Sequence, residues 1–217
     1  MSKMSKKKTI LLGTLGLIFV LSIGVVLAYL QVNTESKANL FTFGNVKIEL
    51  YEDEWDELSD EDKLLYPGKD VNKDPTVKNI GKNDAYIFLE IRVPRASVCI
   101  IDDNENILPA VWTELFTYAV NVGWEQIGND ELSDYGDYVT RVYAYTAMIV
   151  APNTYTTPLF DKVTFVNILE GEISKGTTLI MPINALAIQA EYLNETGDTI
   201  LEKMTDAYMK YQAEPKE

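Results

Sequence analysis

Residues 84–94 carry the clearest alternation of side chains in the chain. Every second position is aliphatic, whereas the intervening positions, from Tyr86 to Arg92, are aromatic or charged. Side chains of a β-strand point alternately to opposite faces, so the pattern predicts a strand with one buried face. Because proline has no N–H for a ladder, we expect this strand to end at Pro94 or to lie at a sheet edge. The aliphatic positions are Ala85, Ile87, Leu89, Ile91 and Val93.

A shorter run of β-type residues at 76–80 precedes this strand, and the polar segment Gly81-Lys82-Asn83-Asp84 separates the two. A four-residue polar loop that contains glycine is typical of a β-hairpin. We therefore expect residues 76–94 to form an antiparallel pair at the centre of the protein.

Further strands are predicted along the rest of the chain, with turn signals between them. Residues 110–127 place apolar side chains at one parity, with Gly123 as a candidate bulge, and residues 129–137 are a polar loop. Ser59 is a candidate cap of a short helix, and residues 199–212 have helical spacing. The predicted strands are 46–51, 110–127, 138–150, 163–169, 177–183 and 184–192.

This succession predicts an all-β fold, a jelly-roll-like antiparallel β-sandwich with long loops and a short C-terminal helix. The long connections at 52–74 and 102–110 favour jelly-roll wiring over a simple meander. We expect a signal peptide at 1–28, an N-terminal arm at 29–43, the sandwich at 44–198, and the helix and tail at 199–217.

The first 28 residues resemble an export signal. A basic stretch, Lys6-Lys7-Lys8, precedes an uncharged apolar run, and small or medium residues lead up to Ala28. We expect signal peptidase to cut between Ala28 and Tyr29. The apolar run is also long enough to remain as a membrane anchor, and this alternative stays open.

Composition excludes several functional classes. The chain has 33 acidic and 19 basic residues and a net charge of −14. The segment before Ala28 contains four lysines and no acidic residue, so the rest of the chain is more acidic than the total suggests. An exported domain of this charge repels nucleic acid and anionic membranes, so we expect no nucleic-acid partner and membrane contact only through the signal segment. The chain contains no histidine, which excludes a Ser-His-Asp triad and an HExxH zinc site. The single cysteine, Cys99, lies in an apolar run and is expected to be a buried, inert thiol.

Two acidic segments allow two interpretations. Nine acidic residues fall between Glu49 and Asp62, and residues 102–106 form a second acidic loop. A solvated surface is the simpler interpretation, and a weak Ca²⁺ site is the alternative. We expect no other cofactor, no metal-ligating set and no catalytic residue.

Several segments, in order, are similar to one bacterial family. After the export signal come Asn39-Leu40-Phe41-Thr42-Phe43-Gly44-Asn45-Val46, and later Asn83-Asp84-Ala85-Tyr86. Thr156-Thr157-Pro158-Leu159-Phe160 and Ala187-Ile188-Gln189-Ala190 follow in the second half. This succession resembles the TasA-like biofilm-fibre proteins and camelysins, which are exported with a dedicated signal peptidase.

The resemblance implies a jelly-roll domain, export from a Gram-positive cell and a structural role in surface or matrix fibres. Camelysins have been described as metal-dependent proteases, but hydrolytic zinc usually takes histidine ligands, which this chain lacks. We therefore expect no proteolytic activity.

Three functional hypotheses follow. The first is a secreted structural protein that self-assembles into filaments and contacts other matrix or cell-surface proteins. The others are a secreted or surface-anchored hydrolase with a carboxylate pair, and a surface binding module that uses Trp55 or Trp124, although both tryptophans are expected in the core.

The arm suggests how assembly would proceed. Once signal peptidase frees it, the arm can add as a strand to an open sheet edge of a neighbouring copy. Pairing of the arm within its own domain is the alternative. The apolar anchors of the arm are Leu30, Val32, Leu40, Phe41 and Phe43.

Overall fold

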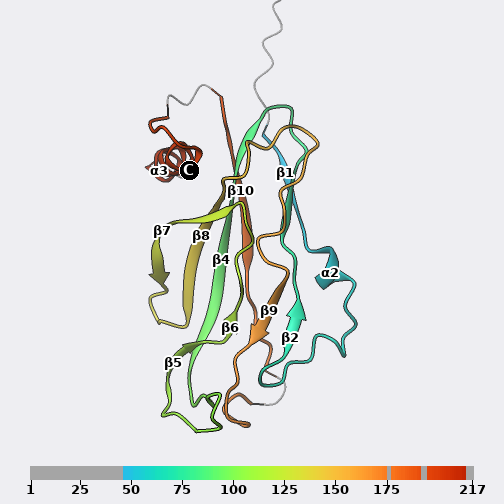
Figure 1. Cartoon of the computed structure of the whole chain (residues 1–217), viewed down its shortest axis with the longest axis vertical. Helices are drawn as coiled ribbons and strands as arrows, with labels where there is room; N and C mark the ends of the chain where they lie inside the picture. Colours follow the sequence, from blue (N-terminus) through green and yellow to red (C-terminus); the bar gives the residue numbers. More distant parts are fainter. Residues whose placement is uncertain (1–45, 175–176, 192–194, 214–217) are drawn as a thin grey trace, which may run out of the picture. The chain divides into compact units, whose positions relative to one another are not determined.

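The computed structural model describes residues 46–174, 177–191 and 195–213. Strand β4 (Ala85–Val98) is the longest strand and has neighbours on both sides (Figure 1). It belongs to a five-stranded antiparallel sheet in the order β10-β4-β8-β7, with β5 paired to the far end of β4. Leu89 therefore faces Ala185 on one side and Tyr143 on the other. The partner strands are β5 (Val111–Glu114), β7 (Trp124–Leu132), β8 (Tyr138–Tyr145) and β10 (Ile183–Gln189).

The second layer of the sandwich consists of two smaller sheets. One pairs β1 (Ile48–Tyr51) with β3 (Thr76–Asn79), and the other has the order β2-β9-β6. Several strands that are neighbours in space, such as β4 and β10 or β2 and β9, are far apart in the chain, as jelly-roll-like wiring requires. The structure thus confirms an all-β antiparallel sandwich with long loops and a short C-terminal helix. The remaining elements are α2 (Asp53–Asp56), β2 (Asp70–Asn72), β6 (Phe116–Thr117) and β9 (Lys162–Phe165).

The main core lies between the layers. The aliphatic side chains predicted on one face of β4 all point into it, and Ile87, Leu89 and Ile91 have no exposed surface. Phe160 and Leu159 pack there from the second layer, and they are equally buried. Burial of alternate residues from both layers is the main stabilising force of such a sandwich.

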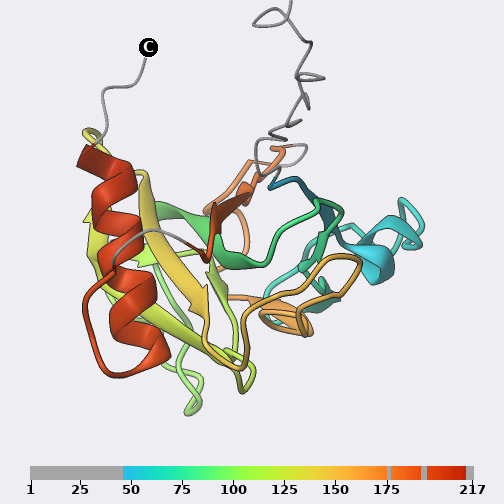
Figure 2. The same cartoon turned by 90° about the horizontal axis from the view of Figure 1, so that it is seen from above.

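The opposite face of β4 is buried at Tyr86 and Phe88 and partly exposed at Glu90 and Arg92, whereas we expected this face to be solvated. Helix α3 (Ile200–Ala213) lies across this face of the sheet, as Figure 2 shows from above. The rings of Phe88 and Tyr208 approach to 5.3 Å, and Tyr86 Oη donates to Glu195 Oε1 at 2.9 Å. A second, smaller core therefore forms between the sheet and the helix.

The start of α3 is defined by a capping box. Glu202 N–H donates to Thr199 Oγ1 at 3.2 Å, and Glu202 Oε2 accepts from Thr199 N–H at 3.0 Å. Each side chain thus accepts a hydrogen bond from a backbone N–H at the first turn. The helix predicted from spacing at 199–212 is confirmed.

The predicted hairpin between the run at 76–80 and β4 is wrong. Strand β3 pairs with β1, and the chain changes sheets at residues 80–84. The fully buried Asn79 makes this corner: its Nδ2 donates to the carbonyls of Asn83 and Val150, both at 2.8 Å. Its Oδ1 accepts from Gly81 N–H at 2.9 Å. The Asn79 side chain thus makes the hydrogen bonds that a hairpin would make between backbone groups. The turn at 80–84 can therefore join two sheets, although its sequence is typical of a hairpin.

Strand β4 does not end at Pro94, and it is not an edge strand there. Arg92 N–H donates to the Pro182 carbonyl, and Leu115 N–H donates to the Pro94 carbonyl. Backbone groups two residues apart point to the same side of a strand, so the missing N–H of Pro94 faces the gap between β10 and β5. On this side, β10 pairs with β4 up to Ile91 and β5 pairs with it from Arg95. Pro94 lies between the two partner strands, so its missing N–H costs no hydrogen bond.

Four local predictions need correction. Gly123 is not a bulge but precedes β7 in a turn with φ of 97°, where an added Cβ would lie 2.9 Å from the Ala147 Cβ. The real bulge lies between Ile127 and Glu131, and β7 continues to Leu132 through the predicted polar loop. Residues 177–182 form no strand. Helix α2 precedes Ser59, whose Oγ instead accepts from Asp62 N–H in a separate turn at 3.1 Å.

Candidate assembly site

Strand β10 ends the five-stranded sheet, and no described strand pairs with its outer side. Its register with β4 is continuous from Ile183 to Gln189, without a bulge. Arg92 N–H bonds the Pro182 carbonyl and Ala190 N–H bonds the Asp84 carbonyl, so even-numbered positions direct their backbone groups toward β4. The backbone N–H and C=O groups of the odd-numbered positions therefore point outward. These positions are Ile183, Ala185, Ala187 and Gln189.

The opposite edge of the sheet, β7, has a different character. It carries Glu125, Asp130 and Glu131, and its register with β8 shifts between Ile127 and Glu131. Charges and bulges are the features by which edge strands avoid pairing with other chains. β10 has neither feature, since residues Ile183–Gln189 include no charged side chain. Of these two edges, β10 is the one suited to accept another strand.

An apolar cleft of about 1150 Å³ lies beside the start of β10. Its walls include buried residues of the β2-β9-β6 sheet, such as Val71 and Phe165. Met181, from the segment that leads into β10, also lines it. Leu64, at its rim, is 65% exposed. The cleft therefore continues the main core to the surface on the side of the open edge.

Trp55 forms part of this cleft and is held by two lysines. Lys63 Nζ and Lys73 Nζ lie 5.0 and 4.9 Å from its ring centroid. Lys73 is buried and pairs with Glu52, with 2.7 Å between Nζ and Oε1. The acidic segment that contains Glu52 is thus fixed to the sandwich at this point, and Trp55 packs against the core as expected.

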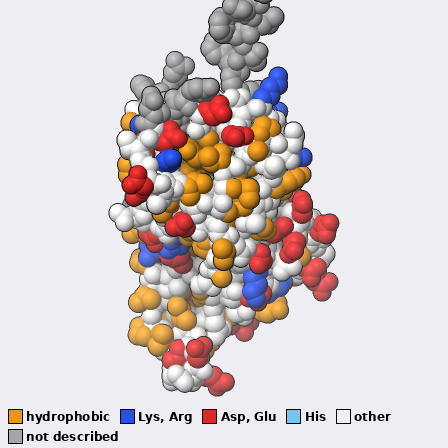
Figure 3. Space-filling view, turned by 45° about the horizontal axis from the view of Figure 1, so that its top comes forward, with side chains coloured by type: hydrophobic (Ala, Val, Ile, Leu, Met, Phe, Trp, Pro, Cys, Tyr) orange, Lys and Arg blue, Asp and Glu red, His pale blue; other side chains and the backbone are white. Residues whose placement is uncertain are grey.

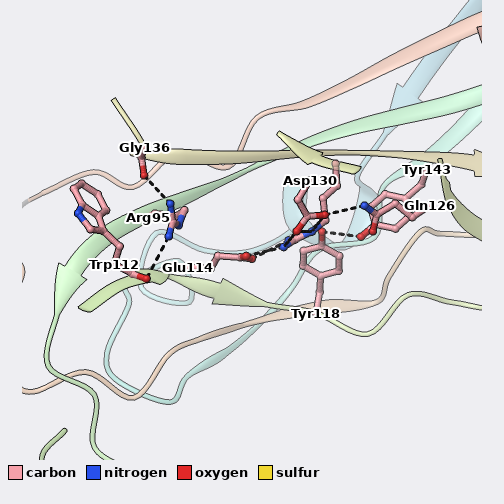
Figure 4. A network of polar contacts seen from close by, with 9 residues as sticks. Arg95, Trp112, Glu114, Tyr118, Gln126, Asp130, Gly136 and Tyr143 are labelled. Atoms are coloured by element: carbon pink, nitrogen blue, oxygen red, sulfur yellow. Dashed lines mark hydrogen bonds and ion pairs between the residues drawn. The ribbon is translucent and has the colours of Figure 1, made fainter. Parts of the chain in front are cut away.

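A polar network links β5, β7 and β8 (Figure 4). Arg141 donates Nη1–H and Nη2–H to the two carboxylate oxygens of Glu114 at 2.8 and 2.6 Å, and Nη2–H also to Asp130 at 2.7 Å. The hydrogen bond from Arg141 lowers the pKa of Asp130 below its usual range. Burial, reinforced by the hydrogen bond with Tyr118, raises the pKa of the Tyr143 phenol.

One guanidinium engages both carboxylates of this network, and it favours the ionised form of Asp130. A general acid needs a proton to donate near neutral pH, so the geometry suits structural clamping across the β7 bulge better than acid–base chemistry.

The acidic segments are partly engaged in local contacts. Asp102 Oδ1 accepts from the backbone N–H groups of Asn104 and Asn106 at 2.9 and 2.8 Å, and these bonds lower the pKa of Asp102. Among residues 46–174, 177–191 and 195–213, no group of three or more potential ligands could hold a metal ion. The weak Ca²⁺ site stays an untested prediction.

The other residues singled out from the sequence are now placed. Trp124 lies in the core at 4% exposed, as expected, whereas Trp112 is 53% exposed. Cys99 is only half-buried, and desolvation raises the pKa of its thiol, which keeps it protonated and poorly nucleophilic. The predicted cleavage site, Ala28 and Tyr29, lies outside the described residues. So do the arm anchors Leu30, Val32, Leu40, Phe41 and Phe43.

Sequence reasoning missed β10 as an open edge, although its signal was present. The segment Ile183–Gln189 is a seven-residue run without charge or proline. The sequence contains no comparable signal for the cleft. Its walls come from several segments between Trp55 and Met181 that meet only in the folded chain.

Comparison with protein-family models, with curated proteins and with solved structures finds no match for this chain. Within the described part of the chain, no helix has the length and apolar character needed to cross a membrane.

Proposed function

We propose that this chain is an exported structural protein of the cell surface or biofilm matrix, without catalytic activity, that assembles into fibres by donating its N-terminal strand. The observation that carries this proposal is the regular, uncharged edge of β10, with which no described strand pairs. An edge of this kind offers a row of free N–H and C=O groups and readily pairs with another chain.

The arm at 29–43 supplies a suitable donor. Added beside β10 of a neighbouring copy, its backbone would bond the outward groups of that strand. Its alternate side chains would reach the apolar cleft; Leu30 and Val32 share one face of such a strand, as do Phe41 and Phe43. Donor and acceptor are different surfaces, so the contact propagates into a filament instead of closing into a dimer.

The resemblance to TasA-like fibre proteins supports the same function, as do the predicted signal peptide and the acidic composition. Cleavage between Ala28 and Tyr29 would release the arm from the membrane and act as the trigger. No specific observation favours the hydrolase or the binding-module alternative. For the hydrolase, the best-defined carboxylate pair, Glu114 and Asp130, is bound by Arg141.

Deleting residues 29–38 from the secreted chain tests the donor. We expect a folded protein with the circular dichroism of the parent and no filaments by electron microscopy. A synthetic peptide of residues 29–43 should bind the truncated protein and raise its melting temperature by mass action.

The acceptor is tested with the substitution Ala187→Pro, which removes one outward N–H from β10 and none that bonds β4. Proline is tolerated at edge positions whose N–H faces solvent, so the variant should fold but polymerise poorly. Leu132→Pro removes an outward N–H from β7 and serves as the matched control that still polymerises. Filaments from the chain without residues 29–38 would refute arm donation, and unimpaired filaments from Ala187→Pro would refute β10 as the acceptor.

A further inference from the structure

Two exposed apolar patches lie at opposite ends of the sandwich. The finger patch lies on the connection between β4 and β5 (residues 99–110, the finger) and on the first two residues of β5, and its four side chains are 43–58% exposed. The turn patch is built from the loops that precede β7 and follow β8, and its side chains are 40–97% exposed. The finger patch comprises Ile107, Leu108, Val111 and Trp112, and the turn patch comprises Val120, Val122, Met148 and Ile149.

Strand β4 separates the patches. Val98, at its C-terminal end, pairs with Val111 of the finger patch. Ala85, at its N-terminal end, bridges Val150, next to the turn patch. The intervening 14 residues of β4 span roughly 45 Å at about 3.3 Å per residue. The two patches therefore cannot cover one another within a single copy.

Each patch is well ordered by its surroundings. The Arg95 guanidinium lies 5.8 Å from the Trp112 ring centroid and donates to the carbonyls of Trp112 and Gly136 at 3.3 and 3.1 Å (Figure 4). Thr146 N–H donates to the Gly123 carbonyl at 2.8 Å and joins the two loops of the turn patch. Preformed surfaces lose little conformational entropy when they bind.

The finger end is acidic, whereas the turn-patch end carries both signs of charge, with Glu49 opposite Lys78 in the β1–β3 pair. The loop at the tip of the finger contains Asp102, Asp103 and Glu105, and Figure 3 shows acidic side chains gathered at the lower tip of the domain. The turn-patch end carries lysines on β3 and on the connections before β1 and after β3. None of them has an ion-pair partner among the described residues. These lysines are Lys47, Lys78 and Lys82.

We propose that the finger patch of one copy docks on the turn patch of a second copy, end to end. This inference rests on the proposed self-assembly and adds a contact that does not involve the arm. Two different surfaces at opposite ends give a heterologous contact, which continues into a linear array.

The chain path fits this arrangement. The first described residue, Val46, leads into β1 beside the turn-patch end, because Ile80 N–H donates to the Lys47 carbonyl at 2.8 Å. The cleft lies toward the finger end, since its lining residue Ile168 bridges Ile100 of the finger. End-to-end docking therefore brings the chain segment that follows the arm of one copy near the cleft of the next.

Residues 44–217 form one compact unit, so the contact can be tested on this segment, which lacks the arm. We expect concentration-dependent self-association in sedimentation experiments at low salt. The substitutions Trp112→Ser and Val122→Ser should each weaken association by about tenfold or more, because truncating a central apolar contact commonly costs that much. Met209→Ser changes a residue on α3 that is 63% exposed and outside both patches, and it should have no effect.

Mixing the two defective variants gives the sharpest result. The intact finger patch of Val122→Ser can dock once on the intact turn patch of Trp112→Ser, so the mixture should form dimers and nothing longer. If Val122→Ser alone dimerises as strongly as the parent segment, the contact is finger to finger and the proposal is wrong.

A segment that stays monomeric at millimolar concentration would also overturn end-to-end docking, while the mature chain could still polymerise through its arm. End-to-end docking would also be overturned if the segment stays monomeric but binds phosphatidylcholine vesicles in a Trp112-dependent manner. The finger patch would then bind a lipid surface instead of a second copy. Loss of filaments on deleting residues 29–38, with association of residues 44–217 retained, would support both contacts separately.

Discussion

Replacing Arg141 with methionine should destabilise the domain substantially. The change removes the guanidinium that bonds Glu114 and Asp130 and leaves two carboxylates beside one another. Exposed ion pairs contribute at most about 1 kcal/mol, whereas removing one partner of a fully buried pair costs about 3–5 kcal/mol. The Arg141 side chain is 15% exposed, and its partners are 33% and 47% exposed. An intermediate loss of about 2–3 kcal/mol is therefore expected.

For a domain of this size, each kcal/mol lowers the melting temperature by about 2–4 °C, so the expected shift is about 4–12 °C. Thermal and urea unfolding of residues 44–217, followed by circular dichroism, measure it. Arg141→Lys keeps the charge but not the two-pronged geometry and should lose about half as much. Adding Asp130→Asn to Arg141→Met should recover part of the loss. A loss below about 0.5 kcal/mol for Arg141→Met would refute the argument that this network clamps the sheet.

Two further predictions concern the sheet corner and acid stability. Asn79→Ala leaves the Gly81 N–H and the carbonyls of Asn83 and Val150 without their partner, so it should cost more than about 2 kcal/mol in urea unfolding; a cost below about 1 kcal/mol would contradict that role for the side chain. The folded-state pKa of Asp102 is lowered, so its contribution to stability is complete above its unfolded pKa of about 4 and disappears as pH falls through the lower folded value. An acid titration of Asp102→Asn should show a shallower loss of stability below about pH 4 than the parent, and identical slopes would show that this carboxylate does not contribute.

Local patterns predicted what depends on local geometry. The period-two alternation located β4, and the spacing of apolar residues located α3, because both signals are properties of one element. The sequence did not show that α3 covers Tyr86 and Phe88, since that packing joins residues more than a hundred positions apart. Large aromatic side chains on a face expected to be solvated were, in retrospect, the available signal.

The errors at the sheet corner and at Pro94 have a common physical cause. In both places a long-range partner replaced the expected ladder: Val150 for Asn79, and the change from β10 to β5 at Pro94. Loop composition and proline rules describe the chain without such partners. The sequence predicted that the arm would meet an open sheet edge, but not which strand forms that edge. The identity of the strand depends on which strands remain unpaired after folding.

The position of β4 in the chain also sets the order in which the domain can be completed. Its neighbours β8, β10 and α3 all follow it in sequence, and α3 ends at Ala213. A ribosome releases the N-terminal part first, so a nascent chain holds β4 without all the partners that bury its two faces until Ala213 has been added. The strand that offers the open edge, β10, is made after β4, β7 and β8. The proposed acceptor is therefore absent until residues up to Gln189 have been synthesised.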